Sequence, residues 1–145
     1  MLHKMGIDLD SILCPRCSSE VESMDHALYG CVELRRLWNA VAHWWNIDIR
    51  NVLKLSNLLE MSMDGVDGNS TPHLWEEVVW SFLYLIWSHR NRMVFERCNR
   101  KLEDQFLEFQ RTSYEWIDQK MGNGRIEWAT WISTPKEALR YRGRF

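Results

Sequence analysis

Three cysteines and one histidine lie within eighteen residues near the start of the chain: Cys14, Cys17, His26 and Cys31. Their spacing is C-x2-C-x8-H-x4-C. Structural zinc sites are tetrahedral, with four sulfur or nitrogen ligands, and a C-x2-C pair commonly supplies two of them. The spacing therefore predicts a structural Zn²⁺ site. Four protein ligands would leave no open position for a catalytic water, so we expect this metal to do no chemistry.

Disulfide bonds are the alternative use for these cysteines. The chain opens with Met-Leu-His-Lys-Met-Gly and has no apolar segment of the kind found in secretory signals. Disulfides persist mainly in oxidising compartments, which a chain without such a signal does not reach. We therefore expect an intracellular protein, in the nucleus or the cytoplasm, with reduced cysteines that bind metal.

Two motifs in the chain resemble parts of one protein family. The first reads C-P-x-C and then E-S-x-x-H-x4-C between residues 14 and 31, with a tryptophan at position 38. The second reads I-W-x-x-R-N-x-x-x-F between residues 86 and 95. Both resemble the zinc-binding domain that follows the polymerase domain in plant LINE-type (non-LTR) retrotransposon reverse transcriptases. The resemblance covers residues 7–98.

The resemblance implies an accessory module that helps a reverse transcriptase to handle its RNA template or single-stranded DNA. The chain has no Y-x-D-D-like acidic pair and no ribonuclease H carboxylate set, so we expect no catalysis and no small-molecule substrate. Compared with the family, the chain looks truncated at its N-terminus. Its ending, W-x-x-W-x-x-x-P over residues 128–135, resembles the linker to a ribonuclease H domain.

Two other functions remain open at this point. The chain could be a helical interaction module that packs against the polymerase or ribonuclease H domain of the same element. It could also be a retroelement relic that folds but has no selected activity.

Charge is unevenly distributed, although the formal net charge of the chain is only −2. Residues 1–31 hold two basic and five acidic residues, whereas residues 125–145 hold five basic and two acidic ones. An acidic metal-binding segment is a poor phosphate site, so any nucleic-acid contact should come from two basic clusters. The candidate contacts are Arg90, Arg92, Arg97, Arg100, Lys101, Arg140, Arg142 and Arg144.

Apolar spacing predicts a mainly α fold, in which a small zinc knuckle leads into a helical bundle. We expect Ser23 to cap a short helix, a helix over 32–45, a shorter one within 51–61, and two long helices over 72–97 and 101–121. The long helices should pair antiparallel across residues 98–100. The apolar run over 78–87 has about ten residues, fewer than the roughly 20 that a membrane span needs, so we expect no membrane contact.

These elements divide the chain into four segments. Residues 1–46 form the zinc-binding segment and its helix, 47–71 a short helix and a flexible loop, and 72–121 the helical hairpin. Residues 122–145 form a basic, linker-like tail. Alternation over 126–131 predicts an extended strand-like segment, and 135–140 could form one helical turn.

Several single residues also carry expectations. Most of the nine tryptophans should pack in a core. Arg90 and Asn91 interrupt an apolar helix, so we expect them mainly to bind a backbone carbonyl or an acidic group, with nucleic-acid contact as the alternative. Glu22 could orient a metal ligand or could be a solvated turn residue. Cys98 should be an inert, small apolar filler.

Overall fold

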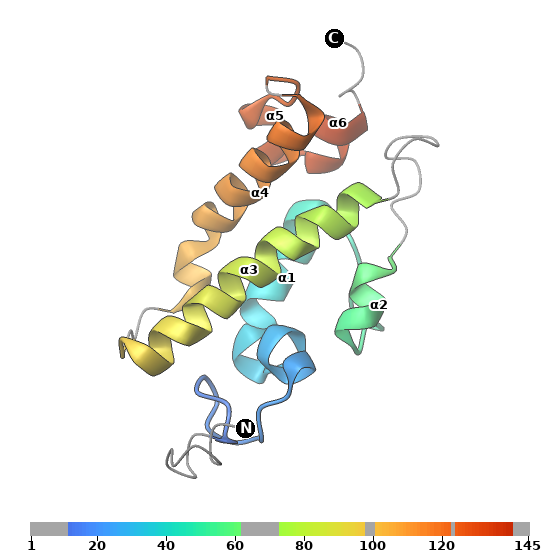
Figure 1. Cartoon of the computed structure of the whole chain (residues 1–145). Helices are drawn as coiled ribbons and strands as arrows, with labels where there is room; N and C mark the ends of the chain where they lie inside the picture. Colours follow the sequence, from blue (N-terminus) through green and yellow to red (C-terminus); the bar gives the residue numbers. More distant parts are fainter. Residues whose placement is uncertain (1–11, 62–72, 98–100, 123, 141–145) are drawn as a thin grey trace.

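The computed structural model describes residues 12–61, 73–97, 101–122 and 124–140, and its architecture is mainly helical (Figure 1). A π-helical turn covers His26–Gly30, and short 3₁₀ helices cover Val32–Leu34 and Leu102–Gln105. The α-helices are α1 (Arg35–Trp45), α2 (Leu55–Leu59), α3 (His73–Phe95), α4 (Phe106–Met121), α5 (Trp128–Ser133) and α6 (Pro135–Arg140). The predicted fold class is therefore confirmed. Within the described ranges, sheet-type pairing is limited to one bridge, between Leu13 and Val21.

Helix α1 follows from the amphipathic spacing of its sequence. Leu37, Trp38, Val41 and Trp45 recur at intervals of one, three and four residues, and all four are buried. The helix ends at Asn46, whose φ of 53° is left-handed and whose N–H bonds to the carbonyl of His43. Asparagine tolerates this conformation better than most residues, so α1 stops there.

Helices α3 and α4 form the predicted antiparallel pair (Figure 1). Near the start of α3, Glu77 accepts a 2.8 Å bond from Lys120 near the end of α4. Gly122, with φ of 101°, ends α4 as the sequence predicts. The first residue of the helix expected over 72–97 and the turn at 98–100 lie outside the described residues. Among the described residues, no helix combines the length and the apolar character that a membrane crossing needs.

Tryptophan side chains dominate the core. The buried members of this set are Trp38, Trp44, Trp45, Trp75 and Trp131. Trp45 meets Trp75 and Trp131 edge to face, with ring centroids 5.1 and 5.6 Å apart, an arrangement that aromatic pairs favour. Four of these indole N–H groups, those of Trp38, Trp44, Trp75 and Trp131, donate to backbone carbonyls, and that of Trp44 reaches the carbonyl of Trp131 at 3.0 Å. Core packing is thus confirmed for these five.

The extended segment expected over 126–131 is wrong, because α5 begins at Trp128. The Trp131 N–H bonds to the Glu127 carbonyl at 2.9 Å, a helical pairing. An alternation of six residues is too short to separate a strand from a helix, and here the burial of Trp131 decides the conformation. The helical turn expected over 135–140 is confirmed as α6.

The inward side of α6 gives a direct test of this C-terminal packing. Leu139 on α6 is 1% exposed, whereas Leu107 on α4 is 56% exposed. We expect Leu139→Ala to lower the free energy of unfolding by about 2–5 kcal/mol, because the substitution leaves a cavity. Leu107→Ala should change it by less than about 0.5 kcal/mol. Denaturant titrations measure both, and equal effects would mean that α6 does not pack on the core.

Candidate metal centre

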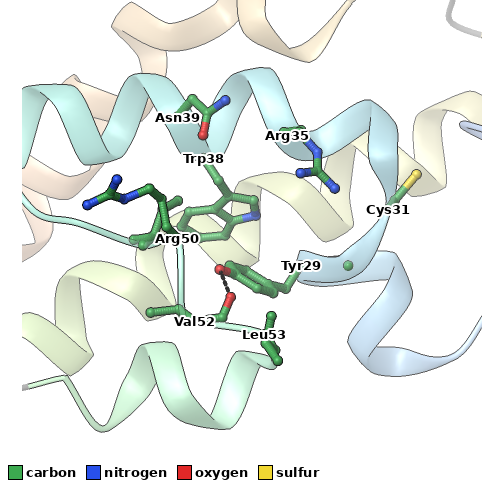
Figure 2. Close-up of a pocket in the computed structure, with 10 residues that line it drawn as sticks. Tyr29, Cys31, Arg35, Trp38, Asn39, Arg50, Val52 and Leu53 are labelled. Atoms are coloured by element: carbon green, nitrogen blue, oxygen red, sulfur yellow. Dashed lines mark hydrogen bonds between the residues drawn. The ribbon is translucent and has the colours of Figure 1, made fainter.

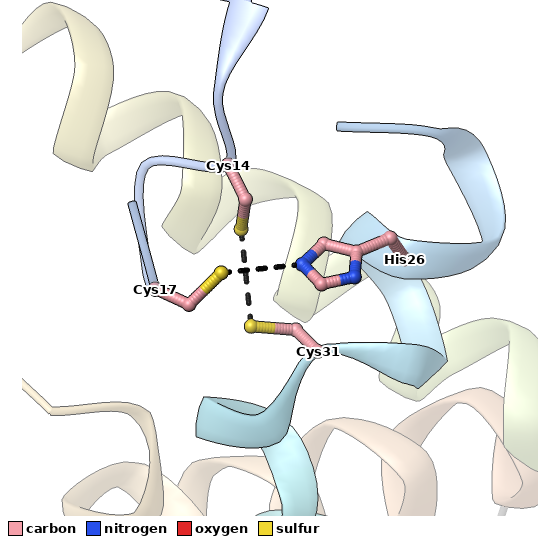
Figure 3. Close-up of side chains that lie close together, drawn as sticks. All are labelled: Cys14, Cys17, His26 and Cys31. Atoms are coloured by element: carbon pink, nitrogen blue, oxygen red, sulfur yellow. Dashed lines mark hydrogen bonds between the residues drawn. The ribbon is translucent and has the colours of Figure 1, made fainter. Parts of the chain in front are cut away.

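The four side chains that the sequence predicts as ligands converge at one point (Figure 3). Their ligand atoms all lie within 4.8 Å of one another, close enough to hold a metal ion. The sulfurs of Cys14 and Cys31 are 3.8 Å apart, and the Cys17 sulfur is 3.4 Å from His26 Nε2. Cys14 and Cys31 are buried, and the other two are mostly covered. The predicted ligand set is therefore brought together.

A tight backbone turn positions Cys14 and Cys17. The Cys14 N–H donates to the Glu20 carbonyl at 2.8 Å, and the Ser18 N–H donates to the Cys14 carbonyl at 2.8 Å. Ser18 adopts a left-handed φ of 55°, which reverses the chain. The bridge between Leu13 and Val21 closes this hairpin. The reversal leaves both thiols on the side that faces His26 and Cys31 (Figure 3).

The other two ligands flank a π-helical turn. Ser23 Oγ accepts a 3.1 Å bond from the His26 N–H, which confirms the predicted cap. Five residues later, the Cys31 N–H donates to the His26 carbonyl at 3.0 Å. This i→i+5 bond brings together two ligands that an α-helical turn would offset. Single π turns are common at functional sites.

Glu20 orients the imidazole of His26. Its Oε2 lies 3.2 Å from His26 Nδ1, which leaves Nε2 facing the thiols. Carboxylates commonly hold metal-binding histidines in this way. Sequence reasoning assigned this role to Glu22 as one of two alternatives, and that choice of residue is wrong. The hairpin bond between Cys14 and Glu20 is what brings Glu20 to the site.

Glu22 instead forms a buried ion pair with Arg90 of α3. Arg90 Nη2 donates to Oε1 at 2.6 Å and Nε to Oε2 at 3.0 Å, and both side chains are at least 86% buried. Arg90 also donates to Asn91 Oδ1 at 3.0 Å. The expectation that Arg90 binds an acidic group is confirmed. Its candidacy as a nucleic-acid contact is wrong, because the guanidinium is buried and already bonded.

Arg16, between the first two cysteines, is a second link that sequence reasoning missed. Its guanidinium donates to the carbonyls of Ala27 at 3.0 Å and Ile86 at 2.7 Å, and lies 3.4 Å from His89 Nδ1. Burial lowers the pKa of Arg16 from its usual value. No local signal identifies these partners, since Ile86 is seventy residues away in the sequence.

Three of the remaining candidate nucleic-acid residues have described side chains. Arg92 is half-buried, and Arg97 and Lys101 are exposed. Arg140 is the last residue of α6, which lies well away from the C-terminal end of α3 (Figure 1). The side chain of Arg140, and residues Arg100, Arg142 and Arg144, lie outside the described part of the chain.

A pocket of about 330 Å³ lies beside the ligand Cys31 (Figure 2). Tyr29 and Trp38 form part of its wall, and the Tyr29 hydroxyl donates to the Val52 carbonyl at 2.6 Å. Two cations, Arg35 and Arg50, also line it. Arg50 forms a 2.7 Å ion pair with Asp48, and this carboxylate offsets part of the Arg50 charge.

The four-ligand cluster is the strongest chemical feature of the described chain. Comparison with protein-family models, with curated proteins and with solved structures found no match for this sequence. The assignment of function therefore depends on the residues of this chain alone.

The contact between the Glu20 carboxylate and His26 should have a measurable effect on metal affinity. We expect Glu20→Ala to weaken metal binding by about 10–100-fold, because the imidazole loses its orienting partner. Glu33→Ala is the matched control, since the Glu33 side chain is exposed and the bond that Glu33 makes to Cys31 comes from its backbone, which the substitution keeps. Competition titrations with a chelator measure both affinities. Equal affinities in the two variants would exclude the orienting role.

Metal affinity should also depend on pH. Burial raises the pKa of Cys31 to about 12. For Cys17, burial raises the pKa but bonds from the Ser19 and Glu20 backbone and from His26 outweigh it and lower it to about 7. Metal binding must therefore release the Cys31 proton, and below pH 7 that of Cys17 as well. As the pH is lowered, we expect metal affinity to fall about tenfold per pH unit for each proton released, and more steeply below pH 7. A metal affinity that stays constant from pH 6 to 8 would contradict this.

Proposed function

We propose that the cluster is a structural zinc site. Zinc–sulfur distances of about 2.3 Å and zinc–nitrogen distances of about 2.0–2.1 Å give tetrahedral edges of about 3.8 Å between sulfurs and about 3.6 Å between sulfur and nitrogen. One sulfur pair, Cys14 and Cys31, is 3.8 Å apart, one sulfur–nitrogen pair, Cys17 and His26, is 3.4 Å apart, and all four ligand atoms lie within 4.8 Å of one another. Three thiolates and an imidazole also suit zinc better than the hard cations Mg²⁺ and Ca²⁺. Four protein ligands make the site structural, with no role in catalysis.

The metal would act by fixing the knuckle, defined as residues 12–31, against α3. Arg16 and Glu22 lie between ligands in the sequence, and both bond to α3 at Ile86 and Arg90. Zinc would hold the backbone that carries these two side chains. Its function is therefore to set the position of α3 relative to the N-terminal segment.

We propose further that the chain is an accessory, non-catalytic module of a retrotransposon reverse transcriptase. One observation carries this proposal: the two motifs that resemble the family meet in space. Glu22 of the first motif pairs with Arg90 of the second, and the Arg90 guanidinium lies 4.9 Å from the Trp87 ring centroid. A joint structural role explains why such motifs occur together. The polymerase or ribonuclease H domain of the same element would be its partner.

Handling of RNA or single-stranded DNA is the second candidate function. The pocket beside Cys31 favours it, because the cations Arg35 and Arg50 adjoin the aromatic rings of Tyr29 and Trp38. Phosphate contacts make binding salt-dependent, with a slope of about 0.7 per contact for a single strand. Arg35→Ala should then flatten the salt dependence of RNA binding by that amount. Absence of binding by the intact chain at low salt would exclude this function.

Ligand replacement with hydrogen exchange tests the structural zinc. We expect Cys17→Ser to abolish stoichiometric zinc binding and to speed amide exchange in the knuckle and in α3 around Arg90, because both lose their common anchor. Cys98→Ser makes the same chemical change outside the ligand set and should keep one zinc per chain.

The outcome for α3 distinguishes the two parts of the proposal. Loss of zinc in Cys17→Ser with unchanged amide exchange around Arg90 would contradict the proposal that the metal fixes the knuckle against α3, but not the metal site itself. Retention of zinc in that variant, or its equal loss in Cys98→Ser, would contradict the ligand set.

A further inference from the structure

Exposed aromatic side chains gather on one face of α3 and on the adjoining side of α4. The set is Trp80, Tyr84, Trp87 and Phe95 on α3, with Trp116 on α4. They are between 38% and 71% exposed, whereas the other side of α3 is buried in the core. Residues spaced by three and four share one side of a helix, so the first three form a continuous stripe. Such a stripe, here called the aromatic face, is unusual on an isolated domain.

Four members of the aromatic face are already held in position. Trp80 Nε1 donates to Glu76 Oε1 at 3.4 Å, the ring centroids of Tyr84 and Trp116 are 6.0 Å apart, and Arg90 lies over Trp87. Ordering a side chain before binding lowers the entropy that association costs. Tryptophan, tyrosine and arginine are also the residues that dominate binding energy at protein interfaces. The face is therefore prepared for a protein partner.

The spacing along α3 favours a helix as that partner. Glu77, Trp80, Tyr84, Trp87, Asn91 and Val94 are separated by three or four residues in alternation, the pattern of paired helices. From the usual size of aromatic side chains, the face offers about 400–600 Å² per molecule. A stable dimer buries about 800 Å² per partner, so this face supplies half or more of what pairing needs.

The charges at the two ends of α3 indicate which kind of molecule would cover the aromatic face. The N-terminal end carries Glu76 and Glu77, the latter paired with Lys120 of α4, and the C-terminal end carries Arg92, followed by the exposed Glu96 and Arg97. This distribution of charge disfavours a nucleic acid as the partner, because the acidic half of the face would repel its phosphates. The same distribution suits an antiparallel copy of the same helix, because a two-fold axis brings unlike ends together twice.

We propose that two copies of this chain associate through antiparallel α3 helices. Packing of the alternating positions places Tyr84 of each copy against Trp87 of the other, close to the two-fold axis. The same arrangement brings the acidic N-terminal end of each α3, with Glu76, toward the basic C-terminal end of the other, just beyond which Arg97 lies. The pairing uses no metal atom and stands whether or not the cluster binds zinc.

Sedimentation equilibrium of the full chain tests the association. We expect a concentration-dependent monomer–dimer equilibrium. Tyr84→Glu should weaken dimerisation at least about tenfold, since two like charges would then face each other near the axis. Leu53→Glu replaces another exposed apolar residue, 77% exposed and away from the face, and should leave the equilibrium unchanged. A monomer at every concentration, or equal effects of both variants, would overturn the proposal.

Complementary charge reversal tests the antiparallel arrangement. Glu76→Arg and Arg97→Glu should each weaken the homodimer, because each creates two like-charge pairs. An equimolar mixture of the two variants should form heterodimers about as well as the original chain, since both contacts are then restored. Both positions lie outside the core, and circular dichroism would establish that each variant is folded. Failure of the mixture of folded variants to associate would overturn the antiparallel pairing.

Discussion

The buried ion pair between Glu22 and Arg90 connects the two parts of this molecule. Glu22 lies in the knuckle, between Cys17 and His26, and Arg90 lies on the long central helix. A lone charge at either position would be costly, because both side chains are largely buried. The pair therefore exists only when the knuckle and α3 are correctly placed. Arg16, bonded to the Ile86 carbonyl, makes a second link of the same kind.

The buried ion pair and hydrogen bonds between the knuckle and α3 require the knuckle to keep a fixed conformation. The knuckle places few large apolar side chains in the core: Leu28 is buried, whereas Ile12, Val21 and Met24 are exposed. Its backbone is held by a few turn bonds and by the four ligand residues. A tetrahedral metal would supply the rigidity that this short segment cannot obtain from packing. The core, by contrast, depends on the contacts of Trp44, Trp45 and Trp131 with one another.

Local patterns in the sequence predict much of this structure. Ser23 before His26 predicts the cap, the C-x2-C spacing predicts the ligand turn, and apolar spacing predicts α1, α3 and α4. The role of Arg90 follows from the cost of burying a cation in an apolar helix. Each of these inferences uses residues within one or two turns of each other.

Contacts between distant parts of the chain account for what the sequence does not predict. Glu20 and Glu22 are alike in sequence, and only the hairpin bond at Cys14 decides which one meets His26. Arg16 has no neighbour that indicates its partners in the core. Helix α5 also forms because Trp131 packs against Trp44 and Trp45, an effect that outweighs the local alternation.

A double-mutant cycle on Glu22 and Arg90 measures whether this ion pair joins the knuckle to α3. The free energy of unfolding of the metal-loaded chain would be measured for the original protein, Glu22→Gln, Arg90→Met and the double variant. We expect each single change to cost about 3–5 kcal/mol and the double change to cost markedly less than their sum. A coupling energy below about 0.5 kcal/mol would mean that the two residues act independently, and it would contradict the claim that this pair joins the knuckle to α3.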